Sequence, residues 1–509
     1  MSVLQCLDDW LIWRIVSAVD PRDWQLLSTT CRSVCNFVLA FLRGLHILDL
    51  SSIGNVNLKR LACACPNLEE LCLNTLLIRS QSLTYVSSLS KLQELQLREC
   101  PLLTDAALHS IFSGLDLQVL DVSWAAEFSD APWGLAPASL REFRGVGCEH
   151  LTERVVVHLS KRCPHLTVLH SSRHINWIGA ARPELLASLV DMQNLQDVAF
   201  QDIPLDDDLL YTLACLPSLS RLELWSYNSD QYITDAGVIC LAEHLRSLTK
   251  LSLDSFVFHG TSVLAALSSC SLQELLLEGT SLCQMGRIDD VELAPSLVKL
   301  RLANCGLAGV MDLSRAAALE YLWLFDNPGL QGVQGAGQQL KTLNLGSTGC
   351  SSLEGFRFDG LDLLDISSTL ISERVFEGVL LAAPRITRAV LGSNVLPLPL
   401  LMAFLQQATH LRNLSLVGAE GSGLSNLARF LWETRSKSSG VAPGLELLEI
   451  SEDSCAMLAE WLTMELDHMV LKRSSKDICI WIIEQHEHSS PYGRIDGADD
   501  SWLPASVPA

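Results

Sequence analysis

The sequence is poor in aromatic and basic residues and has no long apolar run. Aromatic residues make up 6% of its 509 positions, and 36 Lys and Arg stand against 58 Asp and Glu, a formal net charge of −22. This excess of negative charge disfavours nucleic acid and anionic membranes as partners. No stretch approaches the roughly 18 consecutive apolar residues of a membrane span, so no membrane partner is expected.

Motifs of catalysis and metal binding are also missing. The chain has no G-x-x-x-x-G-K-[ST], no G-x-G-x-x-G and no H-E-x-x-H. Cys63 and Cys65 lack a second pair at zinc-site spacing. We therefore expect no enzyme activity, no cofactor and no metal. The 17 cysteines are an odd number, and no basic residue precedes the first apolar stretch, which favours free thiols in the cytoplasm or nucleus.

Leucine dominates instead, in a pattern that recurs along more than 400 residues. The template L-x-x-L-x-L returns mostly every 21 to 29 residues, with one gap of 34. A period in this range predicts a leucine-rich-repeat solenoid, an α/β fold with a curved parallel sheet on the concave face and helices or turns on the convex face. The template begins at Leu45, Leu68, Leu92, Leu117, Leu140, Leu166, Leu195, Leu219, Leu248, Leu272, Leu297, Leu319, Leu340, Leu361, Ile386, Leu411, Leu445 and Leu466.

Other positions of the repeat are also readable. Cys100, Cys148 and Cys305, like Asn327 and Asn394, occupy position nine, where a small side chain faces inward and Asn can bond to turn backbone. Pairs such as Thr104-Asp105, Thr152-Glu153, Thr234-Asp235 and Ser372-Glu373 place an N-cap hydroxyl before an acid that the helix dipole favours. Repeats that start at residues 297, 319 and 340 are short and Gly-rich, so turns or 3₁₀ segments are expected on their convex side.

These patterns divide the chain into four parts. Residues 43–474 form the solenoid of about 18 repeats, preceded by a helical segment at 1–42. Residues 475–488 are expected to form a capping helix that covers the open apolar end. The acidic, Pro-containing tail at 489–509 is expected to be disordered.

The N-terminal segment has its own apolar rhythm. Leu7, Leu11, Ile15 and Val19 recur every four residues, which predicts an amphipathic helix ended by Asp20-Pro21. Together with Asp23 and Cys31-Arg32, these residues make the segment resemble an F-box. It departs from that family's pattern at Asp8, Trp10, Trp24, Thr30 and Val34. F-boxes often precede leucine-rich repeats, and the repeat at Leu92 is similar to the cysteine-containing subclass of F-box/LRR proteins.

The resemblance implies a role without chemistry of its own. An F-box docks on the Skp-family adaptor of a cullin ubiquitin ligase, while the repeats hold a protein substrate near the conjugating enzyme. The residues then expected to face the adaptor are Leu7, Leu11, Ile15, Val19, Pro21 and Cys31. Two alternatives stay open: a plain interaction scaffold in which residues 1–42 only cap the solenoid, and a GTPase-regulating repeat protein.

Strand alternation predicts where a substrate would bind. In L-x-x-L-x-L-x, positions three, five and seven point out on the concave sheet. The repeat at Leu319 places three aromatic side chains at these positions, which is costly unless something covers them. Cations flank them, and aromatics beside cations are typical of binding hot spots. The predicted substrate-binding residues are Arg221, Trp225, Lys250, Lys299, Arg301, Tyr321, Trp323 and Phe325.

Overall fold

The computed structural model describes part of the chain, in segments with gaps between them. These segments are 44–47, 58–59, 62–63, 65–73, 78–125, 127–172, 182–201, 203, 205–225, 233–279, 283–289, 291–335, 339–356, 358–381, 383–392, 394, 398–416, 447–451, 469–473 and 477–482. The chain packs as two units, residues 1–361 with 369–376 and residues 362–368 with 377–509. We describe each unit by itself.

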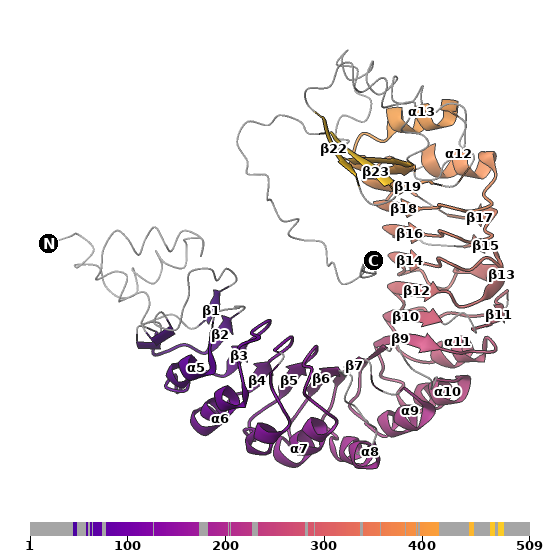
Figure 1. Cartoon of the computed structure of the whole chain (residues 1–509). Coiled ribbons are helices and arrows are strands. Elements are labelled where there is room, and N and C mark those ends of the chain that lie inside the picture. Colours follow the sequence, from indigo (N-terminus) through magenta and orange to yellow (C-terminus); the bar gives the residue numbers. More distant parts are fainter. Residues whose placement is uncertain are drawn as a thin grey trace, which may run out of the picture. The chain divides into compact units, whose positions relative to one another are not determined.

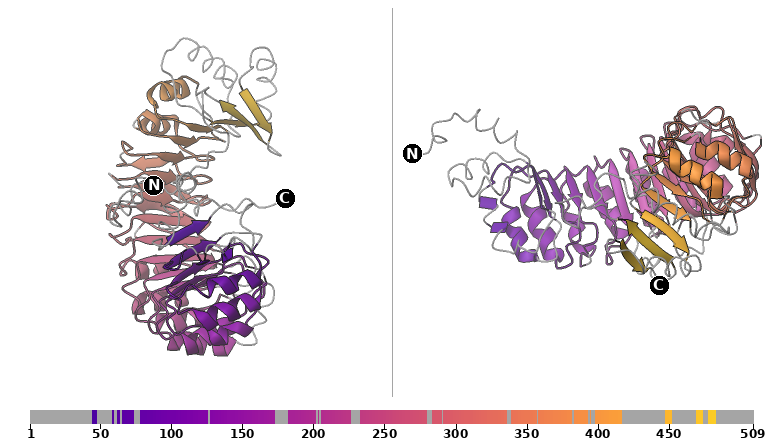
Figure 2. Two further views of the ribbon diagram at one scale, coloured as in Figure 1. Left: turned by 90° about the vertical axis from the view of Figure 1, so that its left-hand side faces the viewer. Right: turned by 90° about the horizontal axis from the view of Figure 1, so that it is seen from above.

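The larger unit is a leucine-rich-repeat solenoid, as the sequence predicts. Figure 1 and Figure 2 show its strands side by side along the inner side of a curve, with helices outside. Successive strands pair in parallel, as in Lys299↔Tyr321 between neighbouring repeats. The strands are β1 (Gly44–Ile47), β2 (Glu70–Leu73), β3 (Glu94–Gln96), β4 (Val119–Asp121), β5 (Glu142–Gly145), β6 (Val168–Ser172), β7 (Asp197–Gln201), β8 (Arg221–Trp225), β9 (Lys250–Phe256), β10 (Glu274–Gly279), β12 (Lys299–Ala303), β14 (Tyr321–Trp323) and β16 (Thr342–Asn344).

The convex side changes character along this unit. Helices cover it first: α5 (Ser80–Val86), α6 (Asp105–Gly114), the 3₁₀ helix η3 (Ala131–Leu135), α7 (Arg154–Arg162), α8 (Arg182–Asp191), α9 (Asp207–Ala214), α10 (Asp235–His244) and α11 (Ser262–Leu267). A second parallel sheet follows, made of β11 (Gly286–Arg287), β13 (Leu307–Asp312), β15 (Leu330–Gln334) and β17 (Ser352–Glu354). The expectation of turns or 3₁₀ segments on this side was wrong. The short connections are extended strands that hydrogen-bond to one another across repeats.

The core of each repeat is built from its leucines and its position-nine residue. Leu300, Leu302, Leu322 and Leu324 are at most 1% exposed. Asn327 is fully buried. Its Oδ1 accepts from two backbone N–H groups and its Nδ2 donates to carbonyls of its own and the preceding repeat. The prediction of an inward position nine is confirmed here.

The acids that open the helices do more than complement a helix dipole. Asp130 Oδ1 accepts from the backbone N–H of Thr152, and its Oδ2 accepts from the Thr152 hydroxyl, at 2.8 and 2.6 Å. Asp207 holds Thr234 of the next repeat in the same way, at 2.9 and 2.6 Å. We call each such carboxylate, together with the Thr that it binds at or just before the N-cap of the next helix, an inter-repeat clasp. The clasps fasten consecutive repeats at the point where the helices begin.

The smaller unit continues the repeat pattern and ends differently. It contains β18 (Leu363–Asp365), β19 (Arg388–Val390), α13 (Leu398–Gln407), β20 (Asn413–Leu416), β21 (Leu447–Ser451), β22 (Met469–Arg473) and β23 (Asp477–Ile482); the boundary between the units falls within α12 (Glu373–Leu381). The prediction of a capping helix at 475–488 was wrong for residues 477–482. These residues form strand β23, which pairs antiparallel with β21 and β22. Alternating Ile478, Ile480 and Ile482 favour strand over helix. Three other predictions lie outside the described residues: the rest of that segment, the helices expected within 1–42 and the disordered tail expected at 489–509.

Candidate functional site: an aromatic strip on the concave sheet

The candidate site lies on the inner face of β8 to β14, where parallel register aligns equivalent positions of successive repeats. Lys299 lies opposite Tyr321, and Arg301 lies opposite Trp323. Glu274 lies opposite both Lys250 and Lys299. Side chains at positions three, five and seven therefore form three rows that run across the strands.

Three aromatic side chains stand on this face in one repeat. Tyr321, Trp323 and Phe325 are half-buried, whereas the alternating Leu322 and Leu324 are fully buried. We call the three rings the aromatic strip. The strand alternation predicted from the sequence is confirmed, and it leaves all three rings partly open to solvent.

Cations lie against two of the rings. Lys299 Nζ is 5.6 Å from the centroid of the Tyr321 ring, and Arg301 Cζ is 5.3 Å from that of Phe325. Both distances lie within the range of cation–π attraction. The predicted placement of Lys299 and Arg301 beside the aromatic strip is confirmed.

Carboxylates that the sequence reading did not single out neutralise these cations. Lys299 Nζ lies 3.0 Å from Glu274, and Lys250 Nζ lies 2.7 Å from Glu223 and 3.8 Å from Glu274. Arg301 forms an ion pair with Glu278. Each of these three cations is thus paired with a carboxylate, and the pairs hold Lys299 and Arg301 beside the rings. The sequence could have identified these carboxylates, because Glu223, Glu274 and Glu278 occupy the outward positions five, three and seven of their repeats.

Arg221 belongs to a separate cluster. Its Nη2 lies 2.6 Å from Asp197 Oδ2, and His170 Nε2 lies 3.1 Å from Asp197 Oδ1, a contact of ion-pair length that is not aligned as a hydrogen bond. Burial alone would raise the pKa of the Asp197 carboxyl, but His170 and Arg221 together hold that pKa below its ordinary value. Arg221 is therefore a fixed partner of a buried acid.

Trp225 also lies apart from the aromatic strip. It ends β8, and β9, β10 and β12 separate it from β14. Four strand spacings of about 4.8 Å put the two roughly 19 Å apart. The eight predicted residues therefore fall into a compact group around the strip and an outlying pair, Arg221 and Trp225. Leu276 at position five of β10 adds an apolar side chain to the face, with 6% exposure.

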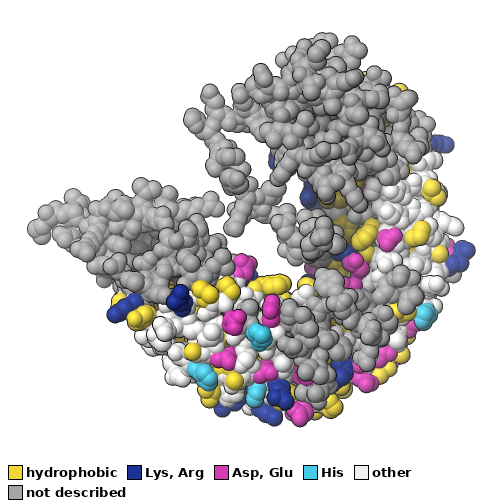
Figure 3. Space-filling model, in the orientation of Figure 1, with side chains coloured by type: hydrophobic (Ala, Val, Ile, Leu, Met, Phe, Trp, Pro, Cys, Tyr) yellow, Lys and Arg dark blue, Asp and Glu magenta, His cyan; other side chains and the backbone are white. Residues whose placement is uncertain are grey.

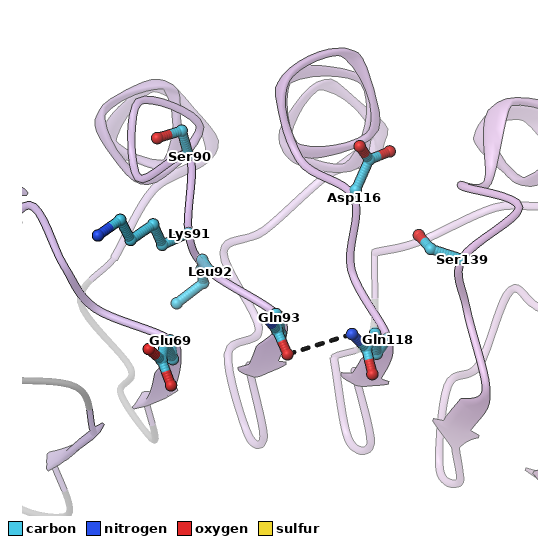
Figure 4. A pocket seen from close by; sticks show the side chains of 8 residues that line it. All are labelled: Glu69, Ser90, Lys91, Leu92, Gln93, Asp116, Gln118 and Ser139. Atoms are coloured by element: carbon cyan, nitrogen blue, oxygen red, sulfur yellow. Dashed lines mark hydrogen bonds between the residues drawn. The ribbon is translucent and has the colours of Figure 1, made fainter.

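A groove of about 410 Å³ lies elsewhere, at the beginnings of the strands near β2 to β5 (Figure 4). Gln118 Nε2 donates to Gln93 Oε1 at 3.1 Å across it, and Lys91 Nζ donates to Asn67 at 2.7 Å. The groove is lined by Glu69, Ser90, Lys91, Leu92, Gln93, Asp116, Gln118 and Ser139.

Other kinds of site find no support in the described part of the chain. Its His, Cys, Asp and Glu side chains form no group of three able to hold a metal ion, and none of its helices has the length and apolar character to traverse a bilayer. On the face visible in Figure 3, acidic and basic side chains are interspersed. The predicted adaptor-facing residues between Leu7 and Cys31 lie outside the described residues.

Comparison with known proteins yields distant likenesses only. No protein-family model and no curated protein sequence matches the chain. The solved structures that it is similar to include TLR13 in a complex with ssRNA13, at 15% identity and a TM-score of 0.36, covering 74% of this chain and 62% of that one. Another is the LRR ectodomain of the Arabidopsis thaliana membrane receptor kinase GASSHO1/SCHENGEN3 with CASPARIAN STRIP INTEGRITY FACTOR 2, at 15% and 0.39, covering 75% and 45%.

Proposed function

We propose that this protein is a non-enzymatic interaction scaffold that binds a protein partner on the concave sheet at the aromatic strip. The observation that carries the proposal is that Tyr321, Trp323 and Phe325, at alternate positions of one repeat, are all half-buried on the concave face. Aromatic surface held open to water is unfavourable in a free protein. Aromatic residues beside an arginine are the usual anchors of protein interfaces.

Two variants of one repeat, a double substitution and a single one, test the site. Trp323→Ala combined with Phe325→Ala should abolish partner binding and lower the free energy of unfolding only modestly, because both rings are part-exposed. Leu322→Ala on the same strand should cost about 2–5 kcal/mol, because its side chain is fully buried. Affinity purification from the protein's own cells, with thermal unfolding of each variant, measures both effects. If the double variant still binds its partners, the proposal that the aromatic strip is the binding site is wrong.

We further propose that the scaffold is the substrate-recognition subunit of a Skp–cullin–F-box ubiquitin ligase. The support is the F-box resemblance of Leu7, Leu11, Ile15, Val19, Asp20-Pro21 and Cys31-Arg32, directly before the repeats. In this role the N-terminal segment binds the adaptor and the concave face holds the target. The chain then acts by raising the target's local concentration near the conjugating enzyme.

Adaptor capture separates this role from that of a scaffold with a helical cap. Full-length protein should retain a purified Skp-family adaptor, and Leu11→Asp with Ile15→Asp should release it. The same variants should still bind the partner of the concave face. If the full chain fails to bind the adaptor, the ligase role is excluded and the interaction scaffold remains.

A further inference from the structure

Position eight of the repeat, just after the inner strand, has an unusual backbone. Apart from glycines, every described residue with a positive φ occupies this position, with values from +47° to +62°. Left-handed backbone suits Gly, Asn and Asp and is unfavourable for bulky side chains. All but one of these residues are accordingly small or polar. They are Glu99, Trp124, Asn304, Asp326, Ser347 and Ser368.

Trp124 is the exception, and its ring is open to solvent. The residue is 57% exposed. Gly147 occupies position eight of the next repeat, and the Trp124 ring covers the place where a Cβ of Gly147 would lie. One face of the ring therefore lies against backbone, and the other is free. No described residue accepts a hydrogen bond from the indole N–H or places a cation over the ring. Packing of the free protein does not explain a tryptophan in this backbone conformation.

An unpaired carboxylate stands beside this ring. Glu99 occupies position eight of the preceding repeat, and its backbone N–H donates to the carbonyl of Ser123 at 3.0 Å, directly before Trp124. Glu99 is exposed, and its carboxylate forms no ion pair or hydrogen bond with any described residue. Arg98, its neighbour in the chain, is instead paired with Asp121 at 2.7 Å. The exposed ring is therefore bordered by a carboxylate that is available to a cation.

We propose that Glu99 and Trp124 form a second binding site, which holds an arginine side chain of a protein partner. A guanidinium group is planar, so it stacks on the free face of the Trp124 ring while its N–H groups donate to the Glu99 carboxylate. A lysine fits less well, because its ammonium group is compact and strongly hydrated. The chain's net charge of −22 also favours the approach of a basic segment.

This second site is separate from the aromatic strip. Both lie within the larger unit. Trp124 follows β4, whereas the strip begins on β14, and seven strands of the inner sheet stand between them. One side chain of a partner cannot contact both places. Loss of binding at either site should therefore leave binding at the other intact.

Selection of random-sequence peptides displayed on phage tests the second site with the full chain. Peptides retained by the wild type and lost on Trp124→Asn should be enriched in arginine. Asparagine tolerates left-handed backbone, so the melting temperature of this variant should stay within about 2 °C of that of the wild type. A much larger fall would show that Trp124 serves packing and would overturn the proposal.

Affinities of one selected peptide, measured by fluorescence anisotropy, test each contact. Trp124→Asn should weaken binding by at least about tenfold, and Glu99→Gln should weaken it by about two- to fivefold. Replacing the peptide's arginine by lysine should also weaken binding. Asp326→Asn is the matched control, because it removes an exposed acid at position eight of a distant repeat. It should leave the affinity unchanged.

Several results would overturn the arginine site. One is that no selected peptide depends on Trp124, and another is that the dependent peptides are not enriched in arginine. Equal losses for Glu99→Gln and Asp326→Asn would show a general effect of net charge instead of a contact. If Trp323→Ala with Phe325→Ala releases the same peptides, they bind at the aromatic strip, and a separate site is excluded.

Discussion

At the scale of single residues, position nine shows how one side chain can serve two repeats. Asn327 Oδ1 accepts from Cys305 N–H and Leu307 N–H at 3.1 Å each, and Nδ2 donates to Leu302 and Leu324 carbonyls. Cysteine fills the same place elsewhere with weaker bonds, as when Cys148 Sγ donates to the Val122 carbonyl at 3.1 Å. A buried amide is thus the stronger tie between neighbouring turns.

Removing this amide should be costly. Asn327→Ala leaves two buried backbone N–H groups without acceptors, so we expect a loss of about 2–4 kcal/mol in the free energy of unfolding. Asn327→Cys should lose less, because the sulfur fills the space. Urea denaturation followed by circular dichroism measures both. Equal losses for the two variants would show that filling the space contributes nothing and that the lost hydrogen bonds account for the whole effect.

Burial also controls the pKa and the reactivity of the cysteine thiols. It raises the pKa of Cys148 and of Cys163 to about 12 and that of Cys350 to about 11. Near pH 8 these thiols stay protonated and unreactive, and their reactivity rises only as the pH approaches those values or the chain unfolds. Cys63 and Cys215 are exposed. Alkylation at pH 8 followed by mass spectrometry should modify this exposed pair before Cys148, Cys163 and Cys350; early labelling of Cys148 would contradict the structure.

Residue-level reasoning from the sequence reached the aromatic strip because alternation in a strand is a local rule. It missed the carboxylates Glu223, Glu274 and Glu278, although the same rule places them on the outward face. Which member of the Arg301–Glu278 pair faces solvent depends on the Phe325 ring that Arg301 packs against. Trp225 was predicted to belong to the same binding surface, and it lies four strands from the strip, so one partner must span roughly 19 Å to contact both.

At the scale of elements, the inter-repeat clasps explain why an acid stands so often at the helix start. A dipole effect alone acts within one helix, whereas Asp130 and Asp207 each bond to a Thr at the helix start of the following repeat. The signal of Thr followed by an acid marks the helix start to within one residue, because Thr104 and Thr234 are N-caps and Thr152 directly precedes the N-cap Glu153. The bond from each Thr back to a carboxylate was hidden, because it crosses from one repeat to the next.

A clasp should therefore couple two repeats energetically. Asp207→Asn and Thr234→Val each remove part of the paired contact, and we expect each to cost about 1–2 kcal/mol. In a double-mutant cycle the combined loss should be smaller than the sum of the single losses, with a coupling energy above about 0.5 kcal/mol. Strictly additive losses, measured by thermal or urea unfolding, would show that the two residues act independently.

The Gly-rich connections show the limit of element prediction. Short length excluded a helix between β12 and β14 correctly, but the extended β13 was not foreseen. Gly309, at φ +87, has no room for a Cβ beside the Asp289 carboxylate. Strand pairing on the convex side arises only when short repeats are adjacent, so no single repeat reveals it.

At the scale of the whole molecule, the repeat period predicted the fold class, and the net negative charge disfavoured nucleic acid and anionic membranes as partners. The period predicts stacking because one repeat cannot bury its own apolar faces. The division into two units was not predictable, because the template continues through residues 361–377 without a composition change. The last strands also differ, since antiparallel β22 and β23 replace the expected parallel repeat and helix.

The net charge yields a test at this scale. With 58 acidic against 36 basic residues, the whole protein should not bind duplex DNA. Fluorescence anisotropy of a labelled duplex at low salt, where electrostatic binding is strongest, should stay flat up to micromolar protein. Saturable, salt-sensitive binding would contradict the exclusion of nucleic acid as a partner.

The clasps carry one further consequence, for recombination of such arrays. A carboxylate in one repeat and a hydroxyl in the next form a matched joint, as Asp207 and Thr234 do. A block of repeats transplanted into another solenoid keeps its internal joints but inherits a foreign surface at each end. Compatible grafts are then those in which an acid meets Ser or Thr at both cuts, so junction chemistry decides which modules can be exchanged.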